Sequence, residues 1–425
     1  MSRPRAAIVV TGSELVRGER TDLNGPFFAR EALGLGLDPA RITVVGDQAE
    51  DLEDALRAAV ADAELCFVSG GLGPTHDDRT VAIVASVSGR ELVLDAELEH
   101  RIEEISRSFA DRLRRPYADF AGGVRKQALV PAGSIVLGPV GTAPGLVVEA
   151  DGCVVVVMPG PPSELRRLWP AALATAPVQA VLARARRPSR RALRFFGASE
   201  SAVAKALADA GGDGDGVEAT ICARDFEIHV DLIVEPDAEA RADLIAAGLR
   251  TPLERYLFAE DERTVQEIVL GLCRDRGLTL ASAESCTGGL VAARLTEVPG
   301  SSEVFLGGVV AYADTVKREE LGVPDEVLAT HGAVSAETAG AMAAGVRQRL
   351  GAGIGLAVTG VAGPGGGTEE KPVGLVFFHA VGPDGEEALR LELPGDREWI
   401  RTRSAVTALH LVRRLLEPER VRNRH

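Results

Sequence analysis

The segment Ala283-Glu-Ser-Cys-Thr-Gly-Gly289 places a serine hydroxyl in a turn between a predicted strand and a predicted helix. Ser285 could act there as a nucleophile. The backbone N–H groups of Thr287, Gly288 and Gly289 would lie at the start of the helix, where they could stabilise an oxyanion or bind a phosphate. The same residues are also explained by a capped helix with Ser285 or Thr287 at the N-cap. The motif by itself leaves both interpretations open.

A serine nucleophile needs a neighbouring base, and the candidate is Lys317. Most basic residues of the chain are arginines, which stay protonated in proteins, and the carboxyl-terminal block contains two lysines, Lys317 and Lys371. A partly buried lysine can lose its proton near neutral pH and accept the proton of a serine. Taken alone, Lys317 is more simply explained as a solvated helix residue that pairs with Glu319 or Glu320.

Cys286 is the competing nucleophile. A reactive thiolate needs a histidine or a helix N-terminus that lowers its pKa, and no histidine is near Cys286 in the sequence. His331 lies in a predicted turn of this block, but nothing places it close to Cys286. Packing as a small apolar side chain is therefore the favoured interpretation of Cys286.

A third chemically interesting loop follows an apolar strand predicted at 354–358. It contains more glycines than a reverse turn needs, which indicates backbone that approaches a ligand, with the hydroxyl groups of Thr359 and Thr368 as donors. The alternative is a flexible surface hairpin. The loop lacks the GxxxxGK[ST] pattern, so P-loop nucleotide hydrolysis is not predicted. Its candidate ligand-binding glycines are Gly363, Gly365, Gly366 and Gly367.

Near the amino terminus, a glycine loop at 69–80 follows the apolar strand predicted at 65–68. In open α/β sheets ligands bind at this end of the strands. Asp77 and Asp78 offer hard oxygen ligands for a divalent cation beside a phosphate. The alternative is a tight turn in which the two acids begin a helix. The candidate residues of this phosphate or metal site are Gly70, Gly71, Gly73, Thr75, Asp77, Asp78 and Thr80.

Short apolar strands alternate with helical segments along the 425 residues, which predicts the α/β class. We expect three domains. Residues 1–170 would form a three-layer domain with a mostly parallel sheet, 171–255 a small α+β domain, and 256–425 a second α/β domain.

The amino-acid composition argues against several classes of function. The chain is 46% hydrophobic and 26% charged, and 47 basic against 62 acidic residues give a net charge of −15. This excess of acid argues against direct nucleic-acid or anionic-membrane binding. The five scattered cysteines have the pattern of reduced thiols, and neither a membrane span nor a signal peptide is predicted. We therefore expect a cytoplasmic protein.

Several motifs in order resemble the CinA family (competence/damage-inducible protein A). Residues 12–15, 21–24, 70–80, 141–145 and 158–165 resemble its molybdopterin-binding-like domain, and Phe196-Gly-Ala-Ser-Glu200 resembles the start of its small KH-type domain. Residues 283–289, 308–312 with Lys317, 332–335 and 359–367 resemble its nicotinamide mononucleotide deamidase domain. One departure is Ala313-Asp314, where Ser-Asn or similar would be expected.

The resemblance implies hydrolysis of nicotinamide mononucleotide to nicotinic acid mononucleotide and ammonia, without a cofactor. Ser285 would be the nucleophile and Lys317 the base and later the proton donor. Tyr312, five residues before Lys317, would orient or share the proton, and the glycines at 363–367 would bind the 5′-phosphate. Pyridine nucleotides are then the expected ligands, and analogy with the family implies a homodimer.

For the amino-terminal domain, the resemblance implies a metal-dependent ADP-ribose pyrophosphatase or an inactive relative of one. Asp78 and Thr80 match a D-x-T motif that related molybdenum-cofactor enzymes place on phosphate and metal, and Glu14 and Asn24 are secondary candidates. The metal would bind Asp77 and Asp78. The alternative function is a non-catalytic scaffold that binds a pterin or nucleotide and is linked to competence.

Overall fold

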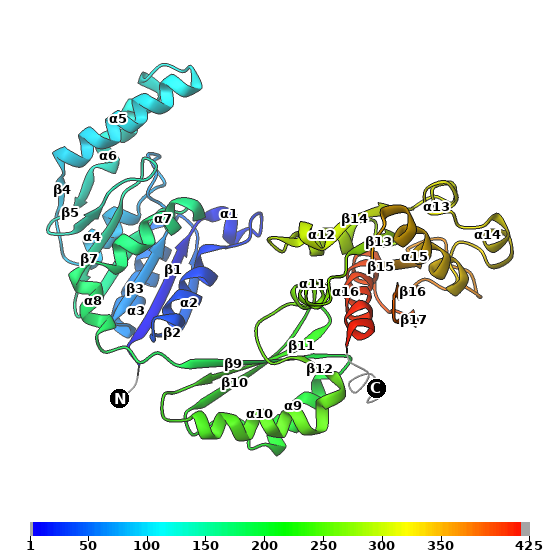
Figure 1. Ribbon diagram of the computed structural model, residues 1–425. Helices are drawn as coiled ribbons and strands as arrows, with labels where there is room; N and C mark the ends of the chain where they lie inside the picture. Colours follow the sequence, from blue (N-terminus) through cyan, green and yellow to red (C-terminus); the bar gives the residue numbers. More distant parts are fainter. Residues whose placement is uncertain (1–2, 418–425) are drawn as a thin grey trace. The chain divides into compact units, whose positions relative to one another are not determined.

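The computed structural model describes residues 3–417 and divides the chain into two compact units (Figure 1). The first unit comprises Met1–Ser189 with Glu235–Asp237, and the second comprises the rest. Both units combine helices with sheets, which confirms the predicted α/β class. Within the described residues, no helix has the length and apolar character needed to cross a membrane.

The first unit is built on a six-stranded sheet with the strand order β2-β1-β3-β8-β7-β6. Its strands are β1 (Arg5–Thr11), β2 (Asp38–Val45), β3 (Leu65–Ser69), β6 (Ile135–Leu137), β7 (Gly145–Ala150) and β8 (Cys153–Met158). β1, β2, β3 and β8 are parallel, whereas β6 and β7 are antiparallel at one edge. The turn between β7 and β8 uses Asp151 and Gly152, both with positive φ, as a tight hairpin requires.

Helices cover both faces of this sheet because its central strands are apolar on both sides. In β1, Ala7 and Val9 pack into one core with α3 and α4, and Ile8 and Val10 pack into the other with α2 and α7. The result is the predicted three-layer arrangement. The helices are α1 (Ser13–Val16), α2 (Asn24–Gly34), α3 (Ala49–Asp62), α4 (Thr80–Val87), α5 (Ala96–Leu113), α6 (Ala118–Gln127), α7 (Pro162–Leu173) and α8 (Ala176–Leu182), and β4 (Leu92–Leu94) pairs with β5 (Leu129–Pro131).

The second unit contains a four-stranded sheet with the order β10-β11-β9-β12. Its strands are β9 (Ser189–Phe196), β10 (Val217–Arg224), β11 (Glu227–Val234) and β12 (Leu257–Ala259). Helices α9 (Glu200–Asp209) and α10 (Glu239–Leu253) pack on one face of this sheet (Figure 1), and a 3-10 turn, η1 (Glu254–Tyr256), follows α10.

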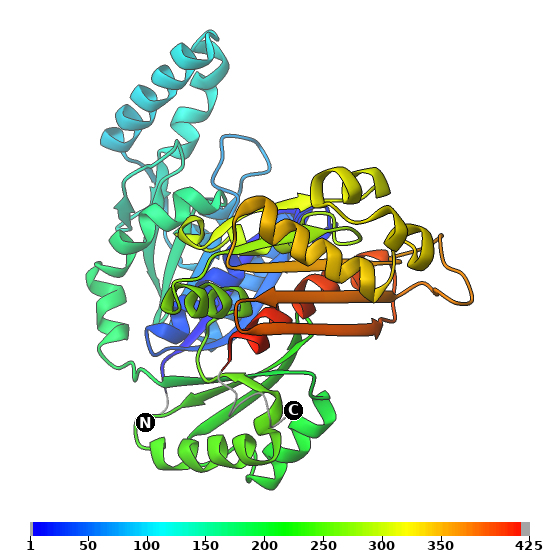
Figure 2. The same cartoon turned by 45° about the vertical axis from the view of Figure 1, so that its right-hand side comes forward.

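The same unit also contains a five-stranded sheet with the order β14-β13-β15-β16-β17. Its strands are β13 (Leu280–Glu284), β14 (Phe305–Val310), β15 (Ile354–Gly360), β16 (Leu375–Gly382) and β17 (Gly385–Glu392). Figure 2 shows α15 on one face of these strands and α16 on the other. The helices are α11 (Val265–Asp275), α12 (Leu290–Thr296), α13 (Asp314–Leu321), α14 (Asp325–His331), α15 (Ala336–Leu350) and α16 (Arg397–Leu416), and η2 (Ser301–Glu303) precedes β14.

The predicted domain boundaries differ from the structure at both positions. Residue 170 lies inside α7, and the first unit continues through α8 because Val178 and Val181 pack into the core with α2. The boundary at 255 lies within η1, and the strand that follows it, β12, pairs with β9. The four-stranded sheet therefore extends to Ala259.

A buried polar cluster joins this sheet to α16. The His410 ring stacks on Phe196, with centroids 3.7 Å apart, and its Nε2 lies 2.7 Å from Glu227 Oε1. Arg413 Nε donates to His410 Nδ1, so Nε2 carries the proton and donates to the carboxylate. Burial lowers the pKa of His410 to about 4, although the hydrogen bond to Glu227 opposes this shift. Burial tends to raise the pKa of Glu227, but hydrogen bonds from His229 and His410 outweigh this effect and lower it.

We predict that His410 makes the protein less stable in mild acid. Between about pH 6.5 and pH 4 the unfolded chain binds a proton at this residue and the folded chain does not, so stability falls as pH falls through this window. The loss between pH 7 and pH 5 is on the order of 2 kcal/mol. His410→Gln keeps a donor for Glu227 but does not titrate, so urea unfolding at the two pH values should show a smaller loss. Equal losses in wild type and variant would contradict this role.

Candidate functional site

The predicted nucleophile and base lie at one edge of the five-stranded sheet. β14 and β15 both run parallel to β13 on either side of it, so the carboxyl ends of the three strands meet at this edge. Here the structure brings together Ser285, Tyr312, Lys317 and Thr359, which line one pocket of about 190 Å³. Ser285 and Tyr312 follow strands, Lys317 lies on α13 and Thr359 lies near the end of β15, so residues separated by up to 74 positions in the sequence share one cavity.

Lys317 is a buried residue on α13, with only 1% of its surface exposed. Its Nζ lies 3.4 Å from the carbonyl oxygen of Tyr312 and 3.3 Å from Asp314 Oδ1. The alternative of a solvated residue paired with Glu319 or Glu320 is wrong. The physical reason is that α13 turns Lys317 toward the strand ends, so that its amine lines the pocket.

The nucleophile loop, residues 285–289, is held by a buried carboxylate. Glu284, the last residue of β13, is 1% exposed and accepts hydrogen bonds from the backbone N–H groups of Gly289, Val291 and Ala292 at 2.9–3.1 Å. These groups belong to the start of α12, where N–H groups lack partners inside the helix. A side chain of the preceding strand thus caps the helix and fixes the turn that carries Ser285.

This cap changes the predicted set of oxyanion donors. The N–H of Gly289 donates to Glu284, and that of Gly288 donates to the Ser285 carbonyl oxygen at 3.1 Å. The prediction that both groups are free to bind a ligand is therefore wrong, because the turn uses them internally. Neither of these hydrogen bonds uses the N–H of Thr287, but Thr287 is fully buried and does not line the pocket.

Cys286 has the environment of a packing residue. It is 5% exposed and belongs to the core formed with α11 and α16. Burial raises the pKa of its thiol to about 12, so the thiol stays protonated at neutral pH. This agrees with the preference for a packing role over a nucleophilic one.

Two arginines of α16 contact the loops of this pocket. Arg401 donates from Nε to the Cys286 carbonyl oxygen at 3.1 Å and from Nη2 to that of Thr287 at 2.9 Å. Arg397 lines the pocket, and its Nη2 lies 3.0 Å from Tyr312 Oη. The Tyr312 hydroxyl therefore contacts Arg397, while the backbone carbonyl of Tyr312 contacts Lys317. The predicted direct link between this hydroxyl and the base is not present.

The glycine loop between β15 and β16 contributes less than predicted. Residues 365–367 are exposed and do not line the pocket. Gly363 is buried, and its carbonyl oxygen accepts a hydrogen bond from Arg397 Nη1 at 2.7 Å. The hydroxyl of Thr359 donates to the Ala333 carbonyl oxygen at 2.7 Å, so its proton is not available to a ligand. The exposed part of the loop, Gly365, Gly366 and Gly367, fits the alternative of a surface hairpin.

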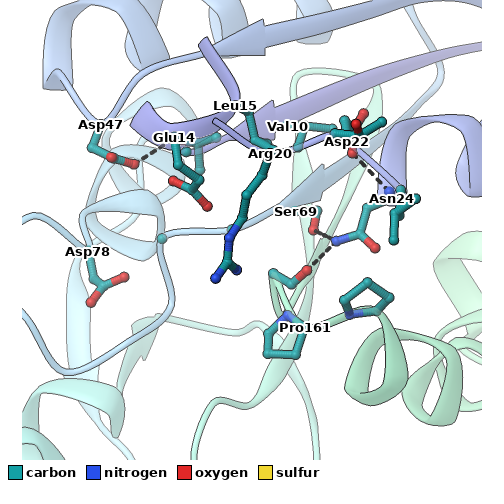
Figure 3. A pocket seen from close by; sticks show the side chains of 18 of the residues that line it. Val10, Glu14, Leu15, Arg20, Asp22, Asn24, Asp47, Ser69, Asp78 and Pro161 are labelled. Carbon is teal, nitrogen blue, oxygen red and sulfur yellow. Dashed lines mark hydrogen bonds between the residues drawn. The ribbon is translucent and has the colours of Figure 1, made fainter. Parts of the chain in front are cut away.

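The first unit has a larger pocket of about 590 Å³ at the carboxyl ends of its parallel strands (Figure 3). The predicted residues that line it are Gly70, Gly71, Asp77, Asp78, Glu14 and Asn24. The amide of Asn24 donates to Ser69 Oγ and to the Gly160 carbonyl oxygen. Figure 3 shows Arg20 extending into the pocket between Asp78 and Asn24. Sequence reasoning had not identified Arg20.

Three other predicted residues of this loop do not line the pocket: Gly73, Thr75 and Thr80. Thr80 is fully buried, and its hydroxyl donates to the Gly70 carbonyl oxygen at 2.8 Å, so it supports the turn instead of binding a ligand. The turn requires glycine, because Gly70 has φ +107° and a Cβ there would lie 2.3 Å from the Thr11 carbonyl oxygen.

Comparison with known proteins gives two matching family models. Residues 262–416 match the model described as CinA C-terminal domain, and residues 7–177 match a probable molybdopterin binding domain. A CinA-like protein of Mycobacterium sp. (strain JLS) is 46% identical over 421 residues, which cover 97% of this chain and 99% of the relative. A CinA-like protein of Mycolicibacterium vanbaalenii is 47% identical over 418 residues, covering 97% and 98%. The chain belongs to the CinA family.

Solved structures of CinA proteins are also similar to part of the chain. The competence/damage inducible protein CihA of Agrobacterium tumefaciens is 40% identical and covers 38% of this chain and 100% of its own, with a TM-score of 0.35. A CinA superfamily protein of Klebsiella pneumoniae is 34% identical and covers 36% and 98%, with a TM-score of 0.34.

The molybdopterin-binding-like domain of this CinA protein offers two adjacent carboxylates, Asp77 and Asp78, at its pocket. Within residues 3–417, no group of three or more His, Cys, Asp or Glu side chains is arranged to bind a metal. Asp77 and Asp78 both accept a hydrogen bond from the Thr75 hydroxyl, and that bond holds the pKa of Asp77 below its usual value. Two carboxylates fit a Mg²⁺ ion whose other ligands are substrate phosphates and water. They do not form a self-contained metal cage.

Sequence reasoning missed the residues that hold the CinA site together. Glu284 directly precedes Ser285, but its capping role depends on the approach of β13 to α12. Arg397 and Arg401 lie more than 100 positions after Ser285, at the start of α16. Their spacing of four residues put them on one side of that helix, which is the available signal. No local pattern indicated which loop that side would contact.

We predict that Glu284→Ala destabilises the second unit. The substitution leaves three backbone N–H groups without their acceptor at the start of α12, a loss on the order of 3 kcal/mol. Urea unfolding measures the change. Glu297→Ala, at an exposed position after the same helix, is the matched control and should shift stability by less than about 0.5 kcal/mol. Similar losses in the two variants would contradict the capping role.

Proposed function

We propose that the protein hydrolyses the carboxamide of nicotinamide mononucleotide to nicotinic acid mononucleotide and ammonia. The observation that carries the proposal is the shared pocket of Ser285 and the buried amine of Lys317, two groups that come from different strand ends. Membership of the CinA family supports the choice of substrate. A serine with a lysine base is sufficient for amide cleavage without a metal.

The pocket residues support an acyl-enzyme route. Lys317 in its neutral form accepts the Ser285 proton while Oγ attacks the carboxamide carbon. The attack gives a tetrahedral oxyanion at the carboxamide carbon. Collapse breaks the C–N bond, and Lys317 returns its proton to the nitrogen that leaves as ammonia. Water then attacks the Ser285 ester with Lys317 again as base, releasing the carboxylic acid and regenerating the hydroxyl.

Arg397 is the proposed partner of the 5′-phosphate. Among the described residues that line the pocket, Lys317 and Arg397 are the two basic side chains. Guanidinium groups pair well with phosphate oxygens. Its contacts with Tyr312 Oη and the Gly363 carbonyl oxygen hold it at the pocket. This proposal replaces the exposed glycines, which lie outside the cavity.

Ser285→Ala should lower kcat/KM for ammonia release from nicotinamide mononucleotide by at least about 1000-fold, because no other nucleophile lines the pocket in a reactive form. Lys317→Met should lower it by about 100-fold or more, since it removes the general base. Lys371→Met and Cys286→Ala are the controls and should stay within a few-fold of wild type. Unchanged ammonia release by Ser285→Ala would defeat the serine assignment.

A second activity is proposed for the first unit, namely metal-dependent cleavage of ADP-ribose. The pocket of about 590 Å³ is large enough for a nucleotide, and it combines carboxylates with a single described cation, Arg20. Asp77 and Asp78 would hold the divalent ion, which would supply Lewis-acid activation of the phosphate. Arg20 would pair with a phosphate oxygen.

Asp78→Asn should lower Mg²⁺-dependent hydrolysis of ADP-ribose to AMP and ribose 5-phosphate by roughly 100-fold, because a charged group at the reacting phosphates is lost. Ser285→Ala should leave this activity unchanged, which separates the two sites. Equal rates for wild type and Asp78→Asn would contradict the assignment. Tight binding of these nucleotides without turnover at either site would favour the alternative, a non-catalytic scaffold linked to competence.

A further inference from the structure

The first two turns of α16 connect the pocket of Ser285 with the four-stranded sheet. Arg397 and Arg401, four residues apart, face the pocket and the nucleophile loop. Trp399 and Arg403, also four residues apart, point roughly 200° away from the first pair, since an α-helix turns about 100° per residue. This second pair contacts Phe226, at the end of the β10–β11 hairpin. The helix therefore lies between the hairpin and the pocket.

The hairpin turn has an unusual composition for its conformation. Arg224 pairs with Glu227, so Asp225 and Phe226 form a two-residue turn, and both have positive φ, 51° and 66°. Such turns favour Asn-Gly, and a bulky side chain in this conformation costs on the order of 1–2 kcal/mol. Turn formation alone thus does not account for Phe226. Its ring packs edge-on against Trp399, with centroids 4.7 Å apart at 84°.

The first residue of the turn, Asp225, contacts α12, the helix that follows the nucleophile loop. Asp225 Oδ1 lies 3.0 Å from Arg294 Nη2, and the Arg294 side chain is only 18% exposed. Arg294 belongs to α12, which begins directly after residues 285–289. One two-residue turn therefore contacts α12, which follows the nucleophile loop, and α16, which donates to that loop through Arg401.

We propose that Asp225 and Phe226 are positioning residues for the Ser285 site. They hold α12 and α16 at a fixed separation, and Arg401 then sets the carbonyl groups of Cys286 and Thr287. This inference rests on the proposed deamidase function for its catalytic consequence. A displacement of the nucleophile by about 1 Å can lower the rate by up to roughly 100-fold, so the turn can affect catalysis without touching substrate.

The test replaces Asp225-Phe226 by Asn-Gly, the sequence that this turn favours. The variant D225N/F226G should fold with an unchanged or higher melting temperature, because the strained Phe226 conformation is relieved. Its kcat for nicotinamide mononucleotide should fall by about 10-fold, with a smaller change in KM. Alkylation of Cys286 by iodoacetamide, located by mass spectrometry, should become several-fold faster, because the loop that buries it is no longer held.

Two controls separate positioning from folding. Phe226→Tyr keeps the ring on Trp399 and should retain wild-type kcat and alkylation rate. Asp215→Gly relieves another positive φ, at the turn before β10, and should also change neither. Wild-type kcat and wild-type Cys286 alkylation in D225N/F226G would overturn the proposal. If the wild-type protein does not deamidate nicotinamide mononucleotide, the proposed function fails, while the alkylation rate still decides whether the turn holds the loop.

Discussion

The carboxylate of Glu284 is the interaction on which the proposed amidase site depends. It lies at the end of a buried strand and satisfies three N–H groups at the start of α12. A buried carboxylate is stable only with such partners, and unpaired helix N–H groups are equally unfavourable in the core. Each side of this contact therefore requires the other. Because Ser285 directly follows Glu284, the position of the nucleophile follows from the cap.

Arg401 also holds this loop. Its guanidinium donates to the carbonyl groups of Cys286 and Thr287. The carboxylate of Glu284 thus accepts a hydrogen bond from a backbone N–H of the loop, and the guanidinium of Arg401 donates to two of its carbonyl groups. Because side chains bind both N–H and carbonyl groups of this loop, the loop loses little further conformational entropy when substrate binds. This pre-organisation favours catalysis.

The sequence predicted those parts of the fold for which a local pattern of apolar residues is sufficient. Apolar strands without alternation, such as the one predicted at 65–68 and present as β3 at Leu65–Ser69, indicated a sheet covered on both faces. Domain boundaries were less accurate. Pro170 is the ninth of the twelve residues of α7, where a proline removes a helical hydrogen bond, and the helix continues through it because Leu168, Trp169 and Ala172 pack into the core of the first unit.

For the sites, residue types and spacing were enough to make Ser285 and Lys317 candidates and to prefer a packing role for Cys286, and the family resemblance added Tyr312. Local sequence could not tell that Lys317 is buried, that Gly288 and Gly289 use their N–H groups internally, or that Thr80 supports a turn. It also gave no sign of Arg397 and Arg401. The hydrogen bonds of Gly288, Gly289 and Thr80 join groups within ten positions. Arg397, in contrast, contacts Tyr312 across 85 positions and Arg401 contacts Cys286 across 115. In each case the residue type alone is compatible with either outcome.

The sequence by itself therefore determined the α/β class, the family and the chemical types available at each strand end, because these follow from local patterns and short motifs. Only the tertiary structure decided which of those groups share a pocket and which are consumed in holding it. The reason is that every backbone donor and buried charge must find a partner. The partners of Arg401 lie more than 100 positions away, and the partners of Glu284 and Lys317, although only three to eight positions away, are set by how the turns after β13 and β14 fold.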